Sequence, residues 1–149
     1  MIPEEPLYEV EIHWNEGRRG TMSSPKLSQN IEVATPPEFP GGVEGIWSPE
    51  HLFVASVSSC FMTTFTAIAE NSKLNFDKLE IKAFGRLGKQ EGKFMMTEII
   101  LRPKLVITDE QYAEKANRIL EKAETACLIS RSVKSKFIFE PEVVIAAYS

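Results

Sequence analysis

Hydrophobic and polar residues alternate in the segment 7–14, near the start of the chain. The apolar positions are Tyr8, Val10, Ile12 and Trp14. This two-residue period predicts a β-strand with one buried and one wet face, and His13 falls on the wet face. Two glycines then flank two arginines in the segment 16–20, which predicts a turn. We expect the chain to return from this turn as a hairpin through residues 21–34.

A helix of about 23 residues is predicted from Pro49 to Asn71. Ser48 suits the N-cap, Pro49 the first helical position and Glu50 the positive end of the helix dipole. Apolar residues cover most of the circumference, so we expect protein to enclose this helix, and its serines and threonines favour a core helix over a bilayer helix. One chain of 149 residues can scarcely wrap it, which predicts a dimer. A loop rich in proline and glycine, residues 35–45, precedes it.

The segments 79–87 and 94–107 have the composition of two long strands joined by a turn at 88–92. Proline cannot donate a hydrogen bond to a neighbouring strand. Pro103 therefore predicts an edge position or a bulge in the second of these strands.

A second helix is predicted after residue 108, because Thr108 and Gln111 have the spacing of a capping box. Its inward residues recur three or four apart and end with Cys127. A short helical turn is expected at 130–134, and the closing strand segments are residues 137–139 and 143–146. This order predicts an α+β fold, with antiparallel sheets around two main helices, in one domain spanning residues 1–149.

Composition and charge exclude several classes of function. The formal net charge is −4, whereas nucleic-acid binding needs a basic face, so no nucleic-acid partner is expected. With 43% hydrophobic and 26% charged residues, a membrane protein is not expected either. The acidic, proline-containing start is unlike a secretory signal, which predicts a cytoplasmic protein. Two cysteines and two separated histidines lack the spacing of a zinc site, and we expect no metal or other cofactor.

The two cysteines, Cys60 and Cys127, each fall on the apolar face of a predicted helix. They are a candidate redox couple, although free cysteines also fill cores as small hydrophobes. A reactive thiolate needs a cation, and Cys60 is too far inside its helix for the dipole to supply one. Arg18 or Arg19 in the turn is the natural source, with Glu50 as the carboxylate that compensates it, within one chain or between subunits.

Three segments of the chain form a specific combination: Glu-Gly-Arg-Arg-Gly at 16–20, Ser-Pro-Glu-His-Leu-Phe-Val-Ala-Ser-Val-Ser-Ser-Cys-Phe at 48–61, and Ala-Cys-Leu-Ile-Ser-Arg-Ser at 126–132. Together they resemble the OsmC/Ohr family, the osmotically inducible and organic hydroperoxide resistance proteins. The similarity extends over essentially the whole chain. The middle segment is the most specific, because a helix-opening proline and glutamate precede a cysteine at a fixed spacing of ten residues.

The resemblance implies an intertwined homodimer with active sites at its interface and no metal or organic cofactor. It implies that Cys60 attacks an organic hydroperoxide, that Arg18 stabilises the thiolate, and that Glu50 holds Arg18. Cys127 would then resolve the Cys60 sulfenic acid as a disulfide. A dithiol, carried by a lipoylated protein in the hydroperoxide-resistance branch, would reduce that disulfide.

The chain departs from the family pattern at Leu128, where members often have proline. Because Arg18 and Arg19 are neighbours, either of them could be the active arginine. The loop at 35–45 also differs from the most closely studied branch. Aromatic and methionine side chains on the first helix are either core residues or the lining of an apolar substrate pocket: Phe53, Phe61 and Met62. Two other functions stay open, a non-catalytic dimer that binds an apolar ligand and a thiol redox sensor.

Overall fold

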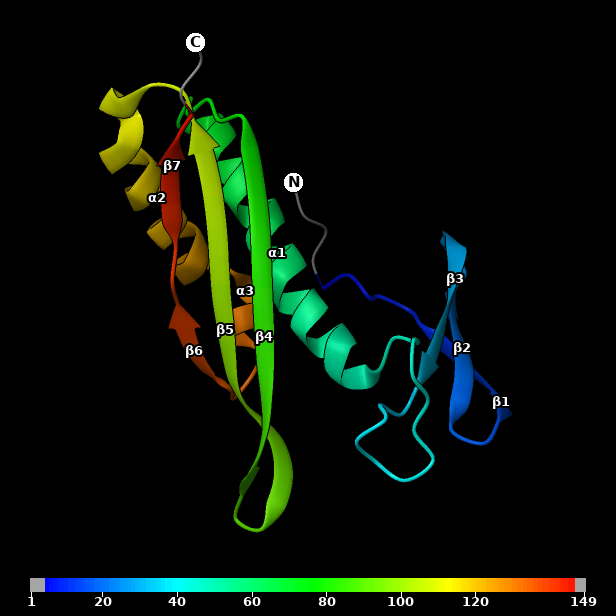
Figure 1. The fold of residues 1–149 in the computed structure, drawn as a ribbon. Coiled ribbons are helices and arrows are strands. Elements are labelled where there is room, and N and C mark those ends of the chain that lie inside the picture. Colours follow the sequence, from blue (N-terminus) through cyan, green and yellow to red (C-terminus); the bar gives the residue numbers. More distant parts are fainter. Residues whose placement is uncertain (1–4, 147–149) are drawn as a thin grey trace. The chain divides into compact units, whose positions relative to one another are not determined.

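The computed structural model describes residues 5–146, drawn in Figure 1. Its contacts divide the chain into two compact units, Met1–Leu52 and Phe53–Ser149. That the whole chain acts as one domain stays a prediction. The prediction that the chain has no secretory signal rests on its acidic start, most of which lies outside the described residues.

The first unit contains an antiparallel sheet in the order β1-β2-β3. Its strands are β1 (Glu11–Glu16), β2 (Arg19–Ser24) and β3 (Leu27–Ala34), which confirms the predicted strand and hairpin. The expected buried face of the first strand is wrong for the single chain, since Ile12 and Trp14 are 60% and 75% exposed. The first unit consists of this sheet, a loop and one helical turn, and therefore has no second layer to cover these side chains.

Helix α1 (Pro49–Asn71) has the predicted bounds, and Ser48 is its N-cap. The Ser48 hydroxyl oxygen accepts a hydrogen bond from the His51 backbone N–H at 3.1 Å and lies 2.7 Å from His51 Nδ1. Ser48 is fully buried, so both contacts satisfy a hydroxyl that would otherwise lack a partner. The serine, proline and glutamate therefore act locally, as their order in the sequence predicts.

The second unit is built on a four-stranded mixed sheet. Strands β4 (Lys78–Gln90) and β5 (Lys93–Ile107) form a long antiparallel hairpin, visible in Figure 1. β6 (Lys136–Phe139) and β7 (Glu142–Ile145) instead pair with β5 in parallel. The prediction of purely antiparallel sheets is corrected on this point. A helical connection follows β5 and returns the chain to the same end of the sheet, which makes the next strand parallel.

Pro103 lies in the middle of a central strand, so the predicted edge position or bulge is wrong. β5 pairs with β4 on one side, with continuous register at Pro103, and with two strands on the other. β6 pairing ends at Leu101 and β7 pairing begins at Lys104. Pro103 occupies the gap between them, where its missing N–H removes no ladder hydrogen bond.

The connection from β5 to β6 contains a 3-10 turn, η1 (Glu110–Tyr112), and the helices α2 (Ala113–Ala126) and α3 (Leu128–Arg131). The cap is Asp109 instead of the predicted Thr108, because an Asp109 carboxylate oxygen accepts the Gln111 N–H at 3.1 Å. The short helical turn starts two residues earlier than predicted. Cys127 is the single residue between α2 and α3.

The hydrophobic core of the second unit lies between its sheet and the helices α1 and α2. It contains Val57, Phe61, Phe65 and Ala69 of α1, Leu74 of the loop between α1 and β4, Ile99, Leu101, Leu105 and Ile107 of β5, and Ala116, Ile119, Leu120 and Ala123 of α2. Only one stripe of α1 is thus buried, which agrees with the expectation that one chain can scarcely wrap this helix; its enclosure by a second copy stays a prediction. By length and composition α1 would also suit a membrane span, a test that the core helix of a globular protein passes as well.

Candidate active site

The structure brings Cys60 and Cys127 together within the second unit. Both are free cysteines whose thiols lie close enough to influence each other's ionisation. Cys60 lies on α1 and is partly exposed, whereas Cys127 is completely buried between two helices. The two sulfurs are therefore close together in the reduced chain, before any disulfide forms.

The pKa of Cys60 is lowered despite partial burial. Burial is the largest single influence and opposes ionisation, but four hydrogen-bonding groups together outweigh it. These are the Cys127 thiol, the Ile129 N–H, the Thr64 hydroxyl and the Leu128 N–H. The Thr64 oxygen lies 3.9 Å from the Cys60 sulfur. A donor-rich environment of this kind favours the thiolate, which is the nucleophilic form of cysteine.

The pKa of Cys127 is shifted in the opposite direction. Burial raises it, and the neighbouring Cys60 sulfur adds to the rise, because a second anion beside the first is unfavourable. The hydroxyl and N–H of Ser130 oppose the rise. The pair therefore favours one thiolate, Cys60, next to one protonated thiol, Cys127.

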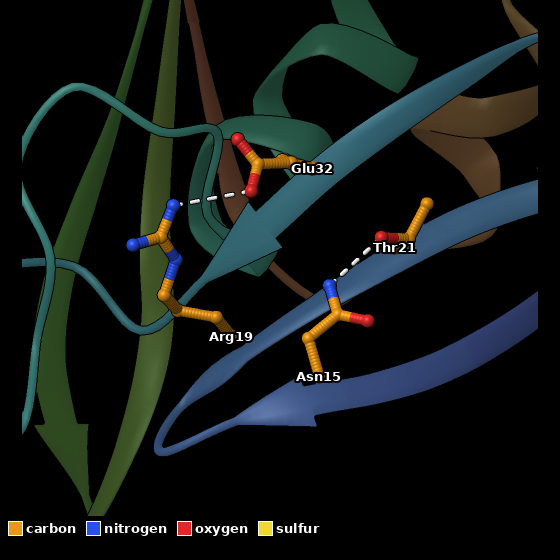
Figure 2. A network of polar contacts seen from close by, with 4 residues as sticks. All are labelled: Asn15, Arg19, Thr21 and Glu32. Atoms are coloured by element: carbon orange, nitrogen blue, oxygen red, sulfur yellow. Dashed lines mark hydrogen bonds and ion pairs between the residues drawn. The ribbon is translucent and has the colours of Figure 1, made fainter.

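The two arginines of the β1–β2 turn differ in their partners. Arg19 Nη2 lies 3.1 Å from a Glu32 carboxylate oxygen across the sheet, as Figure 2 shows beside the hydrogen bond from Asn15 to Thr21. Arg18 is exposed and forms no ion pair with any residue in the described range 5–146. Its side-chain stem lies against Gly41 of the proline- and glycine-rich loop. Arg18 is thus the cation of this turn that is available for a ligand.

Glu50 lies in the first turn of α1. One carboxylate oxygen, Oε1, is buried without a hydrogen-bond partner among the described residues. A buried acceptor without a donor is unfavourable, and a carboxylate especially so. The structure does not join Glu50 to Arg18, so the predicted ion pair is absent from the single chain as described.

An open cavity of about 610 Å³ lies in the second unit. Its apolar lining comes from Phe53, Phe94, Met95, Met96 and Val133, and its polar lining includes Lys93 and Lys134. Phe53 precedes Cys60 by seven residues, about two helical turns, so both lie on the same side of α1. The cavity is a candidate for the predicted apolar pocket.

The other two predicted pocket residues occupy different environments. Phe61 is fully buried, with its ring centroid 6.3 Å from that of Phe65 and 5.7 Å from that of Phe139. Met62 is 44% exposed on the uncovered face of α1. The sequence left open whether Phe61 is a core residue or lines a substrate pocket, and in the single chain it is a core residue.

Four residues that supply donors around the sulfurs were not identified from the sequence. Thr64 follows Cys60 by four residues and Ser130 follows Cys127 by three, so helical spacing would have identified both hydroxyls. The N–H groups of Leu128 and Ile129 depend on the fold and leave no such signal. Leucine at 128, a departure from the family pattern, supplies an N–H that proline would lack.

Within residues 5–146 no group of three or more histidine, cysteine, aspartate or glutamate side chains is arranged to hold a metal ion.

A family model described as OsmC-like protein matches residues 42–142. The chain is 27% identical to organic hydroperoxide resistance protein-like 2 of Staphylococcus saprophyticus, over 94% of this chain and 97% of that protein. It is 26% identical to the uncharacterized protein YmaD of Bacillus subtilis, over 91% and 92%. A solved OsmC-like protein of unknown function from Vibrio cholerae aligns with a TM-score of 0.83 at 25% identity, over 91% of this chain and 99% of that one.

The similarity to solved structures agrees with the α+β architecture. The family model alone spans more than half of the sequence. The chain belongs to the OsmC-like protein family.

Proposed function

We propose that this chain is a cysteine-based thiol peroxidase that reduces organic hydroperoxides to alcohols. The observation that carries the proposal is the asymmetric sulfur pair, with an accessible, thiolate-favouring Cys60 beside a buried, protonated Cys127. The Cys60 thiolate attacks the terminal peroxide oxygen, the O–O bond breaks, and the alkoxide leaves and takes a proton from solvent to become the alcohol. The resulting Cys60 sulfenic acid condenses with the Cys127 thiol to a disulfide and water.

Arg18 is the proposed cation of this reaction and Glu50 its anchor. Arg19 already pairs with Glu32, whereas Arg18 has no such partner among the described residues. The orphan Glu50 oxygen needs a donor, and a guanidinium supplies several. An arginine held by this carboxylate would stabilise both the thiolate and the negative charge that develops on the departing alkoxide.

A homodimer is proposed because the single chain leaves large apolar surfaces exposed. On the first strand and its approach, Tyr8, Val10, Ile12 and Trp14 are each at least 60% exposed. α1 likewise presents an uncovered face that includes Met62. Apolar patches of this kind mark interaction surfaces, and a second copy would cover both. We place this dimer in the cytoplasm, where a dithiol such as a protein-bound lipoyl group would return the disulfide to thiols.

An organic substrate is favoured over hydrogen peroxide by the cavity near the thiol-bearing helix. The apolar half of its lining, made of phenylalanine, methionine and valine side chains, would hold an alkyl or aryl group, and the polar half would contact the polar end of such a substrate. We therefore expect cumene hydroperoxide to oxidise the protein faster than hydrogen peroxide at equal concentration.

Mass spectrometry after one equivalent of cumene hydroperoxide tests the proposal. The wild-type chain should lose two hydrogens, Cys127→Ser should gain one oxygen on Cys60, and Cys60→Ser should do neither. Unchanged masses would favour the apolar-ligand binder with passive thiols. Oxidation without repeated turnover in the presence of dithiols would favour the redox sensor.

A further inference from the structure

The Ser130 hydroxyl is buried beside Cys127 and has no hydrogen-bond partner among the described residues. Ser130 lies in α3, three residues after Cys127, and its hydroxyl is near enough to the sulfur to lower the pKa of the Cys127 thiol, although it forms no regular hydrogen bond with any described residue. A buried donor left unsatisfied is unfavourable and needs an explanation. A stronger acceptor at the Cys127 position, namely a thiolate, would satisfy it.

The two sulfurs differ in access, which fixes where a reductant can attack their disulfide. Cys60 is partly exposed, whereas Cys127 is 0% exposed. Thiol–disulfide exchange requires in-line access to the attacked sulfur, and its rate also depends on how well the leaving thiolate is stabilised. Attack therefore falls on Cys60, and Cys127 is the leaving group. Burial alone would make Cys127 a poor leaving group.

We propose that Ser130 is a positioning residue that donates a hydrogen bond to the Cys127 thiolate as it leaves, and so directs the dithiol reductant to Cys60. This inference rests on the disulfide of the proposed function. Threonine at residue 64 is placed beside the other sulfur, so each cysteine has one hydroxyl.

The electrons and atoms of this step balance as follows. One thiolate of the dithiol attacks Cys60, the Cys60–Cys127 bond breaks, and its electron pair goes to the Cys127 sulfur, where the Ser130 O–H donates to it. The second thiol of the reductant gives up its proton to the Cys127 thiolate. The second sulfur of the reductant then attacks the mixed disulfide, which releases the Cys60 thiolate and leaves the reductant as a cyclic disulfide.

Reduction of the preformed disulfide tests the proposal without relying on peroxide chemistry. Diamide would oxidise the wild-type protein, Ser130→Ala, Ser130→Thr and the control Ser135→Ala. Ser135 is a second buried serine, whose hydroxyl donates to the Met96 carbonyl oxygen and is not among the groups that influence the pKa of either cysteine. After addition of dithiothreitol, quenching with N-ethylmaleimide and mass spectrometry would give the reduction rate of each.

We expect Ser130→Ala to be reduced about tenfold more slowly, since a hydrogen bond to a charged group is at stake. Ser130→Thr should stay within about twofold of wild type because it retains the hydroxyl. In a Cys60→Ser background, Ser130→Ala should also move the alkylation profile of Cys127 to higher pH, and Ser135→Ala should not. A purely structural role would not produce this last shift.

Equal reduction rates for wild type and Ser130→Ala would overturn the inference, as would failure of diamide to form the disulfide. Equal slowing by Ser130→Ala and Ser135→Ala would do the same, because it would indicate general loss of packing. If the disulfide forms and Ser130→Ala slows its reduction, but hydroperoxides never oxidise Cys60, then the proposed peroxidase activity fails while the role of Ser130 stands.

Discussion

The two units of the chain carry different groups of the proposed active site. The thiols are in the second unit and the charged residues are in the first, and only the thiols already have their partners. In the second unit the sulfurs of Cys60 and Cys127 already lie together, surrounded by donors. In the first unit Arg18 has no ion-pair partner among the described residues, and a Glu50 oxygen is buried without a donor. Core packing assembles the thiols within one chain, whereas the charged half still needs a partner.

Burial of the strands shows the same contrast. β5 alternates between buried and more exposed residues along the second sheet, and every residue of β1 is exposed. Both segments carry alternating apolar residues in the sequence. Alternation thus identifies a face that will be covered, but does not say whether the same chain covers it.

The largest effect is expected from removing the core beneath the sulfur pair. Phe61→Ala deletes a fully buried ring adjacent in sequence to Cys60, and should lower the free energy of unfolding by about 3–5 kcal/mol in a denaturant titration. Met62→Ala, on the face of α1 that the single chain leaves exposed, should change it by about 0.5 kcal/mol or less when measured at protein concentrations low enough to keep the chain monomeric. Similar losses for both would show that the two faces of α1 are equally covered in the folded protein, against the single-chain structure.

The arginines of the turn give the next largest effect. Arg18→Ala should slow cumene hydroperoxide consumption by about 100-fold, since one charged donor to the reacting atoms is lost. Arg19→Ala should slow it by less than about threefold, because its exposed pair with Glu32 contributes little. Steady-state peroxidase assays of both variants would measure this. The reverse order would assign the active role to Arg19.

Replacement of Cys127 tests the donors within the second unit. Cys127→Ala removes the S–H that favours the Cys60 thiolate, so the Cys60 pKa should rise towards its ordinary value. Because only the thiolate is alkylated, its reaction with iodoacetamide at pH 7 should slow by about fivefold, the equivalent of one hydrogen bond. The pH at which alkylation is half-maximal should move up accordingly.

Cys127→Ser is the matched control, since its hydroxyl retains a donor. Its alkylation profile should stay close to that of wild type. A profile that does not differ between the alanine and serine variants would indicate that the second sulfur has no influence on the first.

The smallest effect is expected from the Leu128 N–H. Leu128→Pro removes this donor, and proline fits the first helical position after the extended Cys127, so α3 should be preserved. Alkylation of Cys60 at pH 7 should slow by about two- to threefold. Leu128→Ala keeps the N–H and should react like wild type, whereas equal slowing in both would implicate the leucine side chain instead.

Local signals predicted the first helix well. Ser48, Pro49 and Glu50 act through contacts within one turn, and the helix begins where their order indicates. Pro103 was misinterpreted because the reason it fits a central strand lies elsewhere, at the break between β6 and β7. A residue pattern within one segment cannot predict which strands, distant in sequence, will pair with that segment.

The candidate site shows the same limit. Helical periodicity placed both cysteines on inward faces. It did not show that the two sulfurs lie close together, because that depends on how α2 packs in the fold. Only the family resemblance implied this proximity. The donors to Cys60 come in part from backbone N–H groups of α3, and these have no residue-type signature. The unpaired state of Glu50 likewise required the structure, because an acidic residue in a first helical turn is ordinary.

Parallel pairing of β6 and β7 with β5 has a consequence for biosynthesis. The sheet cannot be completed until residue 145 has left the ribosome, since two partners of β5 are translated only after α2 and α3. Contacts between distant segments form slowly and leave apolar surface open meanwhile. Until Phe139 of β6 packs against Phe61, the part of α1 that carries Cys60 is incompletely covered, and we expect the chain to depend on a reducing compartment while it is being made.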